Sequence, residues 1–444
     1  MFNIQRINQP IRPKHCFLFL SGLKNNRHKS MVQQLTYATR YFIKKNNLNK
    51  KSTRLSFTPF LISLIILYSV QTTTNATEAK NFPHEILGAT VSISFAPNGR
   101  LWRLIPTKKA IYVDFSNDSG NTYSKPIRVN KIEQKISVWP ENPPAILISN
   151  SGRINILYYA DEEQKSTSFF SYSDDNGQTF SIPVLISDQA QSAMHYMDKM
   201  LIDKNDKLYL FWHDTRHESH DKEIGTGVLS LYYSIKMPSG DSQFSNYFLS
   251  SGICSCCRTA TAFSNKGKPV ILARMVYSNG IRDHALIQMN EDDSWQKPTR
   301  VTHDNWEVEA CPEHGPAIAI DAKNRTHLTW FTLGDTRQGI FYAQTDDFGK
   351  IVSTPVTLGN IERLPSHADV IALDQRVVIV WKEFDGEQSS LHIKESHDRG
   401  ISWLDKTTDL KSSSQNSHPK LVSNNKDIFL SWTSADKGHQ IIKL

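Results

Sequence analysis

Polar turns alternate with short apolar runs along the chain from about residue 89 to its end. Each turn is rich in Asn, Asp or Gly, which accept the positive φ of a tight turn, and closes on a basic residue. These basic residues, separated by 53, 54, 61, 57, 51 and 50 positions, are Arg100, Arg153, Lys207, Lys268, Arg325, Arg376 and Lys426. An apolar run of β type follows each turn, as at residues 208–212 and 377–381. The pattern predicts repeated antiparallel strands and no helix.

A bulky aromatic residue lies five or six positions after most of these turns. The aromatic residues are Tyr158, Trp212, Trp330, Trp381 and Trp432. In the fourth repeat this position holds Arg274. We therefore expect a packing position to serve a polar purpose there, because a buried guanidinium needs an anionic or hydrogen-bonding partner.

A second signature, Ser-x-Asp-x-Gly-x-Thr-aromatic, follows further along several repeats. It occupies residues 116–123 and 173–180, residues 396–403 carry it with Ser for Thr, and residues 345–349 are a degenerate copy. Its Asp side chain is expected to accept backbone N–H groups, and its Gly to take the left-handed conformation. A structural role in these turns is predicted for Asp118, Gly120, Asp175, Gly177, Asp347, Gly349, Asp398 and Gly400.

These turns resemble the Asp-box, or BNR, repeats of sialidases and related propellers, over residues 85–444. The resemblance implies an all-β fold, a β-propeller of four-stranded antiparallel blades. The recurring turns favour seven blades over the six of sialidases. The last unit, residues 418–444, has room for only three strands, and we expect the segment 82–87 to supply the fourth and close the ring.

The N-terminal region carries the features of a secretory signal. Residues 1–76 contain 12 Lys and Arg and no Asp or Glu, and residues 57–70 form an apolar core too short for a typical membrane span. Met31 is a plausible true start. We predict a leader at 1–76 and a single propeller domain at 77–444, in the periplasm or secreted. The alternative is an uncleaved leader that anchors the protein in the membrane.

The positive net charge of the chain belongs to this leader. The rest of the chain has 39 basic and 44 acidic residues, a net charge of −5. Binding to nucleic acid is therefore not expected. We expect a monomer that meets the membrane only through an uncleaved leader.

Loops between second and third strands and loops between blades share one face of a propeller. On that face the sequence places Asp214, Arg216, Cys254, Cys256, Cys257, Arg258, Arg282, Asp283, Cys311, Glu313 and His314. Four cysteines in an exported chain favour disulfides, such as Cys254 or Cys256 with Cys311. The alternative is ligation of copper or zinc by the four thiolates, with His314 as a further ligand.

A further regularity concerns the start of the innermost strands. Five residues lie 8–12 positions before the turn that follows them in the sequence: His195, Cys257, His314, His367 and His418. We expect these side chains to converge at the centre of the propeller. They are either metal ligands or solvated loop residues.

The family resemblance implies three arginines that bind a substrate carboxylate, an Asp acid/base and a Tyr nucleophile. Arg103 lies in a motif that is one residue longer than the arginine motif of the family. The segment between this motif and the first Asp box is too short to carry the Asp acid/base. Arg103 is then part of a strand. The remaining candidates are Arg258, Arg274 and Arg282 for an anion, and Asp283 and Glu313 as acid or base, with binding roles for Asp214, Arg216, His314 and His367.

Two functions follow from these observations. The first is a glycoside hydrolase of exo-α-sialidase type that acts on an anionic glycan. The second is a non-catalytic propeller that binds a glycan, a protein partner or a metal through its Cys- and His-bearing face. We expect the pocket at the cysteine loops, with Asp283 or a bound acidic ligand as the partner of Arg274.

Overall fold

A computed structural model describes residues 85–162, 165–188, 193–217, 228–237, 244–346, 348–350 and 352–444. They belong to a compact unit bounded by Thr77 and Leu444. The predicted leader lies outside the described residues, so its prediction is not tested. No helix within the described ranges has the length and apolar character needed to cross a bilayer.

The fold consists of antiparallel sheets that follow one another along the chain. The first sheet contains β1 (Ser92–Phe95), β2 (Leu101–Pro106), β3 (Ile111–Ser116) and β4 (Ile127–Arg128). The second contains β5 (Lys135–Ile136), β6 (Ala145–Ile148), β7 (Ile154–Glu162), β8 (Lys165–Ser173) and β9 (Val184–Leu185). A larger sheet contains β10 (His195–Ile202), β11 (Leu208–Asp214), β12 (Val228–Lys236), β13 (Tyr247–Cys254), β14 (Ala260–Phe263), β15 (Pro269–Val276), β16 (Arg282–Gln288) and β17 (Thr299–Arg300).

The remaining strands form three further sheets. One contains β18 (Ala317–Ile320), β19 (Thr326–Leu333), β20 (Gln338–Thr345) and β21 (Val356–Leu358). The next contains β22 (Ser366–Leu373), β23 (Arg376–Phe384), β24 (Ser389–Ser396), β25 (Leu404–Lys406) and β26 (Lys411–Ser412). The last contains β27 (Lys420–Ser423), β28 (Ile428–Ser434) and β29 (Gly438–Lys443).

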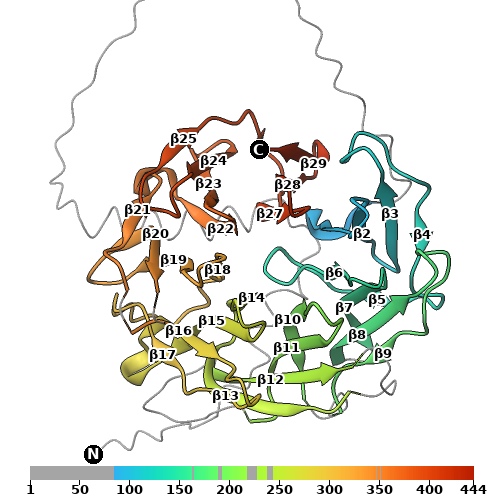
Figure 1. Cartoon of the computed structure of the whole chain (residues 1–444). Helices are drawn as coiled ribbons and strands as arrows, with labels where there is room; N and C mark the ends of the chain where they lie inside the picture. Colours follow the sequence, from blue (N-terminus) through green and yellow to red (C-terminus); the bar gives the residue numbers. More distant parts are fainter. Residues whose placement is uncertain are drawn as a thin grey trace, which may run out of the picture. The chain divides into compact units, whose positions relative to one another are not determined.

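The sheets are arranged around a central axis, as in a β-propeller (Figure 1). Contacts join the inner strands in the order β1, β6, β10, β14, β18, β22 and β27. β27 contacts β1 in turn, and the rings of Phe95 and Phe429 lie 4.8 Å apart across this junction. The described part of the chain therefore closes on itself, and the all-β propeller prediction is confirmed at this level.

Apolar side chains fill the spaces between neighbouring sheets. Strand residues alternate between two faces, so each buried sheet presents apolar side chains to both neighbours. Trp102, Ile154 and Tyr158 belong to one such cluster, and Leu157, Trp212 and other residues of the next two sheets belong to another. The aromatic residues predicted after the turns at Tyr158, Trp212, Trp330, Trp381 and Trp432 are all buried.

The predicted turn chemistry is present in the turns at residues 116–123, 173–180 and 396–403. The Asp118 carboxylate accepts the Thr122 backbone N–H at 2.9 Å and the Thr122 hydroxyl at 2.6 Å. Asp175 and Asp398 make the matching bonds in their own turns. The glycines of these turns and of the degenerate copy have φ between 80° and 99°, at Gly120, Gly177, Gly349 and Gly400. Asp347 lies outside the described residues.

The predicted closing strand is not formed by the residues that the structure describes. Leu87–Ala89 is a short 3₁₀ helix, η1, and residues 85–86 are not in a strand. Leu87 packs against the apolar cluster of the first two sheets, and Gly88 lies beside Val138, which follows β5. Gly88 takes φ 64°, which turns the chain away from an extended path. Residues 82–84 lie outside the described part of the chain.

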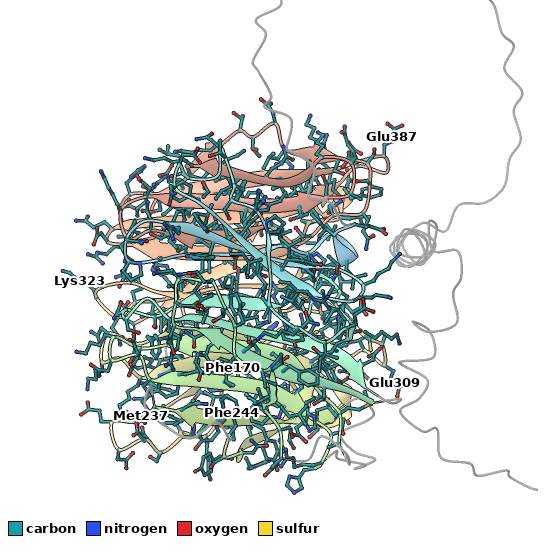
Figure 2. All side chains as sticks on the ribbon, turned by 90° about the vertical axis from the view of Figure 1, so that its right-hand side faces the viewer. Phe170, Met237, Phe244, Glu309, Lys323 and Glu387 are labelled. Atoms are coloured by element: carbon teal, nitrogen blue, oxygen red, sulfur yellow. The ribbon has the colours of Figure 1, made fainter. Side chains whose placement is uncertain are left out.

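Loop positions agree with the predicted division into two faces. Figure 2 places Lys323, in a loop between first and second strands, and Met237, after β12, on one side. Glu309, in a connection between sheets, and Glu387, in a loop between second and third strands, lie on the opposite side. The side of Glu309 and Glu387 is called the loop face below, because it carries the predicted site.

Candidate functional site on the loop face

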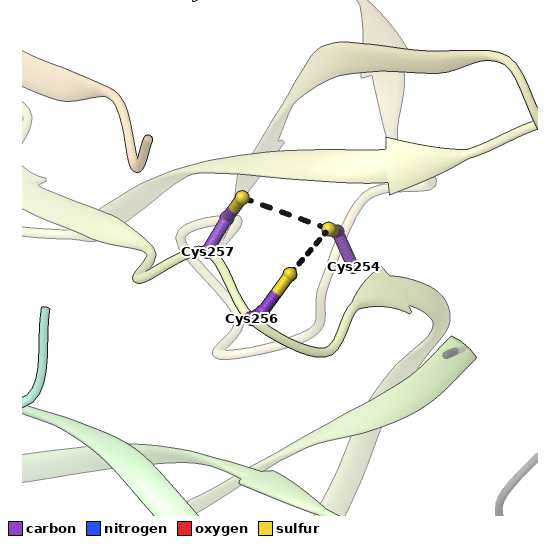
Figure 3. A group of neighbouring side chains, drawn as sticks. All are labelled: Cys254, Cys256 and Cys257. Carbon is purple, nitrogen blue, oxygen red and sulfur yellow. Dashed lines mark hydrogen bonds between the residues drawn. The ribbon is translucent and has the colours of Figure 1, made fainter. Parts of the chain in front are cut away.

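Four cysteines gather on the loop face and are called the thiol cluster: Cys254, Cys256, Cys257 and Cys311. Cys254 ends β13, and the chain then turns so that Cys256 and Cys257 point back at it (Figure 3). The Cys254 sulfur lies 3.9 Å from that of Cys256 and 3.6 Å from that of Cys257. Cys311 reaches Cys256 from the connection before β18.

No disulfide joins any two of these four cysteines in this structure, so the predicted disulfide is not formed. The two sulfur separations are well beyond the roughly 2.05 Å of an S–S bond. Hydrogen bonds from the Cys256 and Cys257 thiols, with the nearby charges of Arg282 and Arg274, lower the pKa of Cys254 well below its ordinary value. Burial and hydrogen bonding to Cys254 raise the pKa of Cys257, so one thiolate is stabilised by neutral thiols.

Arg282 and Arg274 occupy the same face of the β15–β16 pair. The Arg282 guanidinium donates to the Cys254 sulfur and to the Val308 carbonyl, both at 3.0 Å. Arg274 donates to the backbone carbonyls of Phe331 at 2.7 Å, His314 at 3.0 Å and Arg282 at 3.2 Å. The predicted proximity of Arg282 and the cysteines is confirmed, and Arg274 joins the two sheets that meet here.

Asp283 is not the partner of Arg274, contrary to the prediction. It pairs with Arg300 and accepts the backbone N–H groups of Asp304 and Asn305. The reason is strand alternation, because adjacent residues of β16 point to opposite faces. Asp283 lies opposite Met275 in the ladder, whereas Arg274 lies opposite His284. Asp283 is therefore separated from the predicted site.

Asp214 and Arg216 form a different, internal group. Asp214 accepts the Trp212 indole N–H at 3.0 Å and pairs with Arg216, which also binds Asp188. His195 belongs to this group, since its Nε2 lies 3.4 Å from Asp214. The prediction that His195 meets the other central histidines is wrong, and so is the expected place of Asp214 and Arg216 in the pocket. These side chains hold β10 and β11 in place.

A second group of polar side chains lies among the inner strands and the connections that lead to them. It is called the central cluster and consists of Glu141, Lys199, Arg258, His314, His367, Lys382, His418 and Lys420. Glu141, from the loop between β5 and β6 of the second sheet, pairs with Arg258 and accepts the Gly315 backbone N–H at 2.7 Å. One carboxylate thus ties together segments from three parts of the ring.

The three histidines of the central cluster stack in a row. The His314 and His367 ring centroids lie 4.5 Å apart, and those of His367 and His418 lie 3.6 Å apart. Burial, then the charge of Arg274, lowers the pKa of His314 to about 3, and burial lowers the pKa of the other two well below the ordinary value. The row is therefore neutral at pH 7, although His367 Nδ1 and both ring nitrogens of His418 find no hydrogen-bond partner among the described residues.

Three lysines complete the central cluster. Lys199 donates to the Asp198 carbonyl and Lys382 to the Asn416 side-chain oxygen, both at 3.0 Å. Lys420 lies 3.3 Å from Asp369. Burial lowers the pKa of Lys199 to about 7 and that of Lys382 to about 8, and it also lowers that of Lys420. The Lys420 side chain is still 44% exposed. Water therefore reaches Lys420, although neighbouring groups desolvate its ammonium group.

Glu313 lies between the two clusters. The residue is exposed at the surface, and partial desolvation of its carboxyl, followed by the charges of Glu141 and Cys311, raises its pKa to about 7. Its backbone has φ 53°, and its carbonyl oxygen accepts a bond from His367 Nε2 at 3.1 Å. His367 itself has φ 54° beside a register shift in β22. Left-handed backbone at non-glycine residues is costly and concentrates at functional sites, so the predicted importance of Glu313 and His367 keeps its support.

The donor set of the central cluster suits an anion better than a metal. Ligand atoms of Glu141, His367 and His418 lie within 4.8 Å of one another, close enough to share an ion. However, Arg258 and Lys382 both act on these histidines electrostatically and would repel a cation. His314 belongs to this cluster and not to the thiol cluster, so its predicted role as a ligand beside the cysteines is not supported by the geometry.

A separate hollow lies on the surface beside the thiol cluster. It is lined by residues 305–309 and 333–335, which include Trp306, Glu307, Glu309 and Asp335. Its ionisable side chains are acidic, so it does not suit an anionic ligand. We therefore base the functional argument on the two clusters.

Sequence reasoning missed four members of the central cluster: Glu141, Lys199, Lys382 and Lys420. One signal was available for Lys382, which follows the apolar run 377–381 within a predicted buried strand. A lysine is almost never buried there without a reason. Glu141 lies in a connection that belongs to no repeat, and no spacing rule points to it.

No family model matches the chain, and no curated protein matches it. Solved structures do resemble it. The BP39L lectin from Burkholderia pseudomallei is 11% identical with a TM-score of 0.54, over 81% of this chain and 99% of the lectin. A polysaccharide lyase of family PL25, an ulvan lyase, is 12% identical with a TM-score of 0.53, over 81% and 94%. The Hadza microbial sialidase Hz136 is 12% identical with a TM-score of 0.47, over 76% and 73%. At such identities the likeness concerns the fold alone.

Proposed function

We propose that this chain is an exported propeller that binds an acidic glycan at the central cluster. The observation that carries the proposal is the unbalanced positive charge of that cluster. Among the described residues, neither Lys199 nor Lys382 forms an ion pair with a carboxylate. Glu141, and for Lys199 also Asp198, act on these ammonium groups only at a distance. The lowered pKa values express the cost of enclosing the ammonium groups without a directly bound carboxylate. A carboxylate or sulfate of a glycan would offset it.

The finer description of the fold is part of the proposal. The larger sheet is formed by two four-stranded halves, β10–β13 and β14–β17, which are joined through the single pair Ile253 and Met275. Counted as two blades, they give seven blades in all, the last of three strands. The Asp118, Asp175 and Asp398 turns are then Asp-box, or BNR, repeats, and the folded unit is a monomer exported by the leader at 1–76.

A second candidate function is cleavage of that glycan by β-elimination. Lys199, with a pKa of about 7, is partly deprotonated near neutrality and supports the role of general base. The base takes the proton from the carbon beside a uronate carboxylate, and a C=C bond forms as the C–O bond to the next sugar breaks. The leaving oxygen takes the electron pair and a proton, for which Glu313 is the candidate acid. Lys382 and Arg258 would stabilise the charge that develops on the carboxylate.

Hydrolysis of the sialidase type has less support from the site. Arg274 binds three carbonyls, Arg258 binds Glu141, and Arg282 binds Cys254 and Val308. These three candidate guanidiniums are therefore already engaged by groups of the described chain and are not available as a set to hold a substrate carboxylate. Tyr277 packs against Arg300, and burial raises its pKa to about 12, which is unsuited to a nucleophile.

Calorimetric titration of the full chain with uronate oligosaccharides tests the proposal, with neutral oligosaccharides of equal length as the comparison. We expect binding of the acidic series only, and weaker binding at higher salt. Lys382→Met should weaken binding about tenfold, roughly 1.4 kcal/mol. Lys323→Met is the matched control, because Lys323 lies on the opposite face (Figure 2).

Three results decide between the alternatives. Equal binding of neutral and acidic sugars, or equal effects of Lys382→Met and Lys323→Met, would remove the proposal. Ultraviolet absorbance from an unsaturated uronate would establish elimination, and Lys199→Met should abolish it while binding persists. Binding without any new absorbance would leave a lectin-like role. N-terminal sequencing of the protein from fractionated cells tests export, and a cytoplasmic protein that retains residues 31–76 would contradict it.

A further inference from the structure

The thiol cluster has no part in the proposed glycan binding, yet it is a built feature of the fold. Its members come from two connections, residues 254–257 after β13 and Cys311 before β18. Cys254 and Cys257 are 0% and 1% exposed, which is unusual for two thiols that face each other without a bond. Something other than packing is needed to explain why sulfur atoms, rather than methyl groups, meet here.

We propose that Cys254, Cys256, Cys257 and Cys311 bind one soft metal ion, zinc or cuprous copper, through their thiolates. The ion would fasten the loop after β13 to the connection before β18. This inference is independent of the glycan proposal, since it concerns other side chains.

The distances among the sulfur atoms fit such an ion. Ligand atoms of Cys254, Cys256 and Cys257 lie within 4.8 Å of one another, and two of the separations are 3.6 and 3.9 Å. A zinc–sulfur bond of about 2.3 Å in a tetrahedral site requires sulfur separations of about 3.8 Å. The sulfurs therefore already stand at the spacing of shared ligands. Cys311, which reaches Cys256, supplies the fourth position.

The charges around the cluster also favour thiolates bound to a metal. Four thiolates on zinc, or three on cuprous copper, leave a net charge of about −2, which cationic neighbours would stabilise. Arg282 donates directly to the Cys254 sulfur at 3.0 Å. Arg274 acts on Cys254 and Cys257 through its charge. Sulfur-only ligation selects soft ions over magnesium or calcium.

A disulfide explains the arrangement less well. Cys254 makes contacts of similar length with both Cys256 and Cys257, so neither pair is singled out. Cys256 and Cys257 are adjacent in sequence, and a bond between neighbours would strain the loop. A route for an incoming ion exists, because Cys311 is exposed and Cys256 is partly exposed.

The experiment uses the full chain, purified under inert gas without a chelating resin. The reduced protein is incubated with one equivalent of zinc or of cuprous copper, passed through gel filtration and analysed for bound metal by mass spectrometry. We expect one ion per chain in at least one arm, together with loss of the thiols' reactivity toward a disulfide reagent. The arm that retains metal identifies the ion.

Variants locate the site. Cys256→Ser should lower the affinity for the metal more than about 100-fold, measured in competition with a chelating dye. Arg282→Gln should lower that affinity by about tenfold, as expected for a residue that hydrogen-bonds a metal ligand. Cys16→Ser is the matched control, since Cys16 lies in the leader sequence, and it should retain the wild-type affinity. A circular-dichroism melt of each variant establishes that it is folded.

Two results would overturn the inference. One is a folded, reduced wild-type chain that retains neither metal. The other is an intact mass, on protein isolated from its own host, that shows two disulfides. Glycan titration of the same metal-free protein distinguishes failure of the metal site from failure of the glycan proposal, because the absence of a metal site leaves acidic-glycan binding unchanged.

Discussion

Glu141 and Arg258 form a buried ion pair at the centre of the propeller, although 117 positions separate them in the sequence. Each side chain is only 3% exposed. The second carboxylate oxygen of Glu141 accepts the Gly315 N–H, so this residue joins the loop between β5 and β6 to two later connections. The pair therefore places Arg258 next to the histidine row.

The first prediction concerns this ion pair. Glu141→Gln leaves the Arg258 guanidinium buried without a counterion, which should lower the free energy of unfolding by about 3–5 kcal/mol. Chemical denaturation measures the change. Adding Arg258→Met to the variant should restore part of the loss, because the uncompensated charge is removed.

Glu291→Gln is the control for this substitution. Glu291 pairs with Lys266 at the surface, where both side chains are more than 60% exposed, and such pairs contribute little. We expect no measurable change. Equal stability of Glu141→Gln and the wild type would show that the central pair does not hold the connections together.

The second prediction concerns the acid stability of the turns that contain Asp118 and Asp175. Hydrogen bonds, first from Ser116 for Asp118 and from Thr179 for Asp175, lower both pKa values to about 2. Stability from a lowered carboxyl pKa is present above its unfolded value near 4 and is lost as pH falls toward 2. Thermal melts should therefore drop over this window, and less so in the Asp118→Asn, Asp175→Asn double variant. Asp409→Asn, at an exposed position, should leave the slope unchanged.

The third prediction concerns the pH dependence of glycan binding. Lys382, with a pKa of about 8, faces Glu141, Arg258 and the three histidines, and a bound carboxylate should raise that pKa. A ligand that raises the pKa by one unit binds about tenfold more tightly below it than above it. Affinity should thus increase as pH falls from 9 to 7, with proton uptake measurable by calorimetry in two buffers. Lys382→Met should remove the dependence, and an unchanged profile in that variant would assign it elsewhere.

The sequence specified the local features of the fold because they depend on local chemistry. Turns at Asp118 and Asp175, strands after each turn and the division of loops into two faces follow from residue type and strand topology. Pairings across the ring do not. Residue type alone pairs Asp283 with Arg274. In the ladder, however, Asp283 lies one position away from the residue opposite Arg274, so its side chain points to the other face of the sheet. Glu141 reaches its partners from a connection outside the repeat, and only folding brings them together.

The fourth prediction concerns Gly315, whose N–H donates to Glu141. A Cβ at this position would lie 2.3 Å from Arg258 Cγ and 2.7 Å from the Arg258 carbonyl oxygen, closer than atoms can pack. Because backbone cannot move aside easily, Gly315→Ala should displace Arg258 from Glu141 and cost about 1–3 kcal/mol, as overpacking does. It should also weaken acidic-glycan binding, since the Arg258 guanidinium contributes positive charge to the central cluster.

Gly334→Ala separates these two effects. A Cβ there would meet the Asp304 carbonyl at 2.1 Å, a comparable clash in the turn after β19, where none of the central-cluster residues lies. Both variants should lose stability in chemical denaturation, but only Gly315→Ala should lose affinity in the calorimetric titration. If both lose affinity equally, the effect of Gly315 reflects general loosening of the fold, and the link from Gly315 through Arg258 to the ligand is wrong.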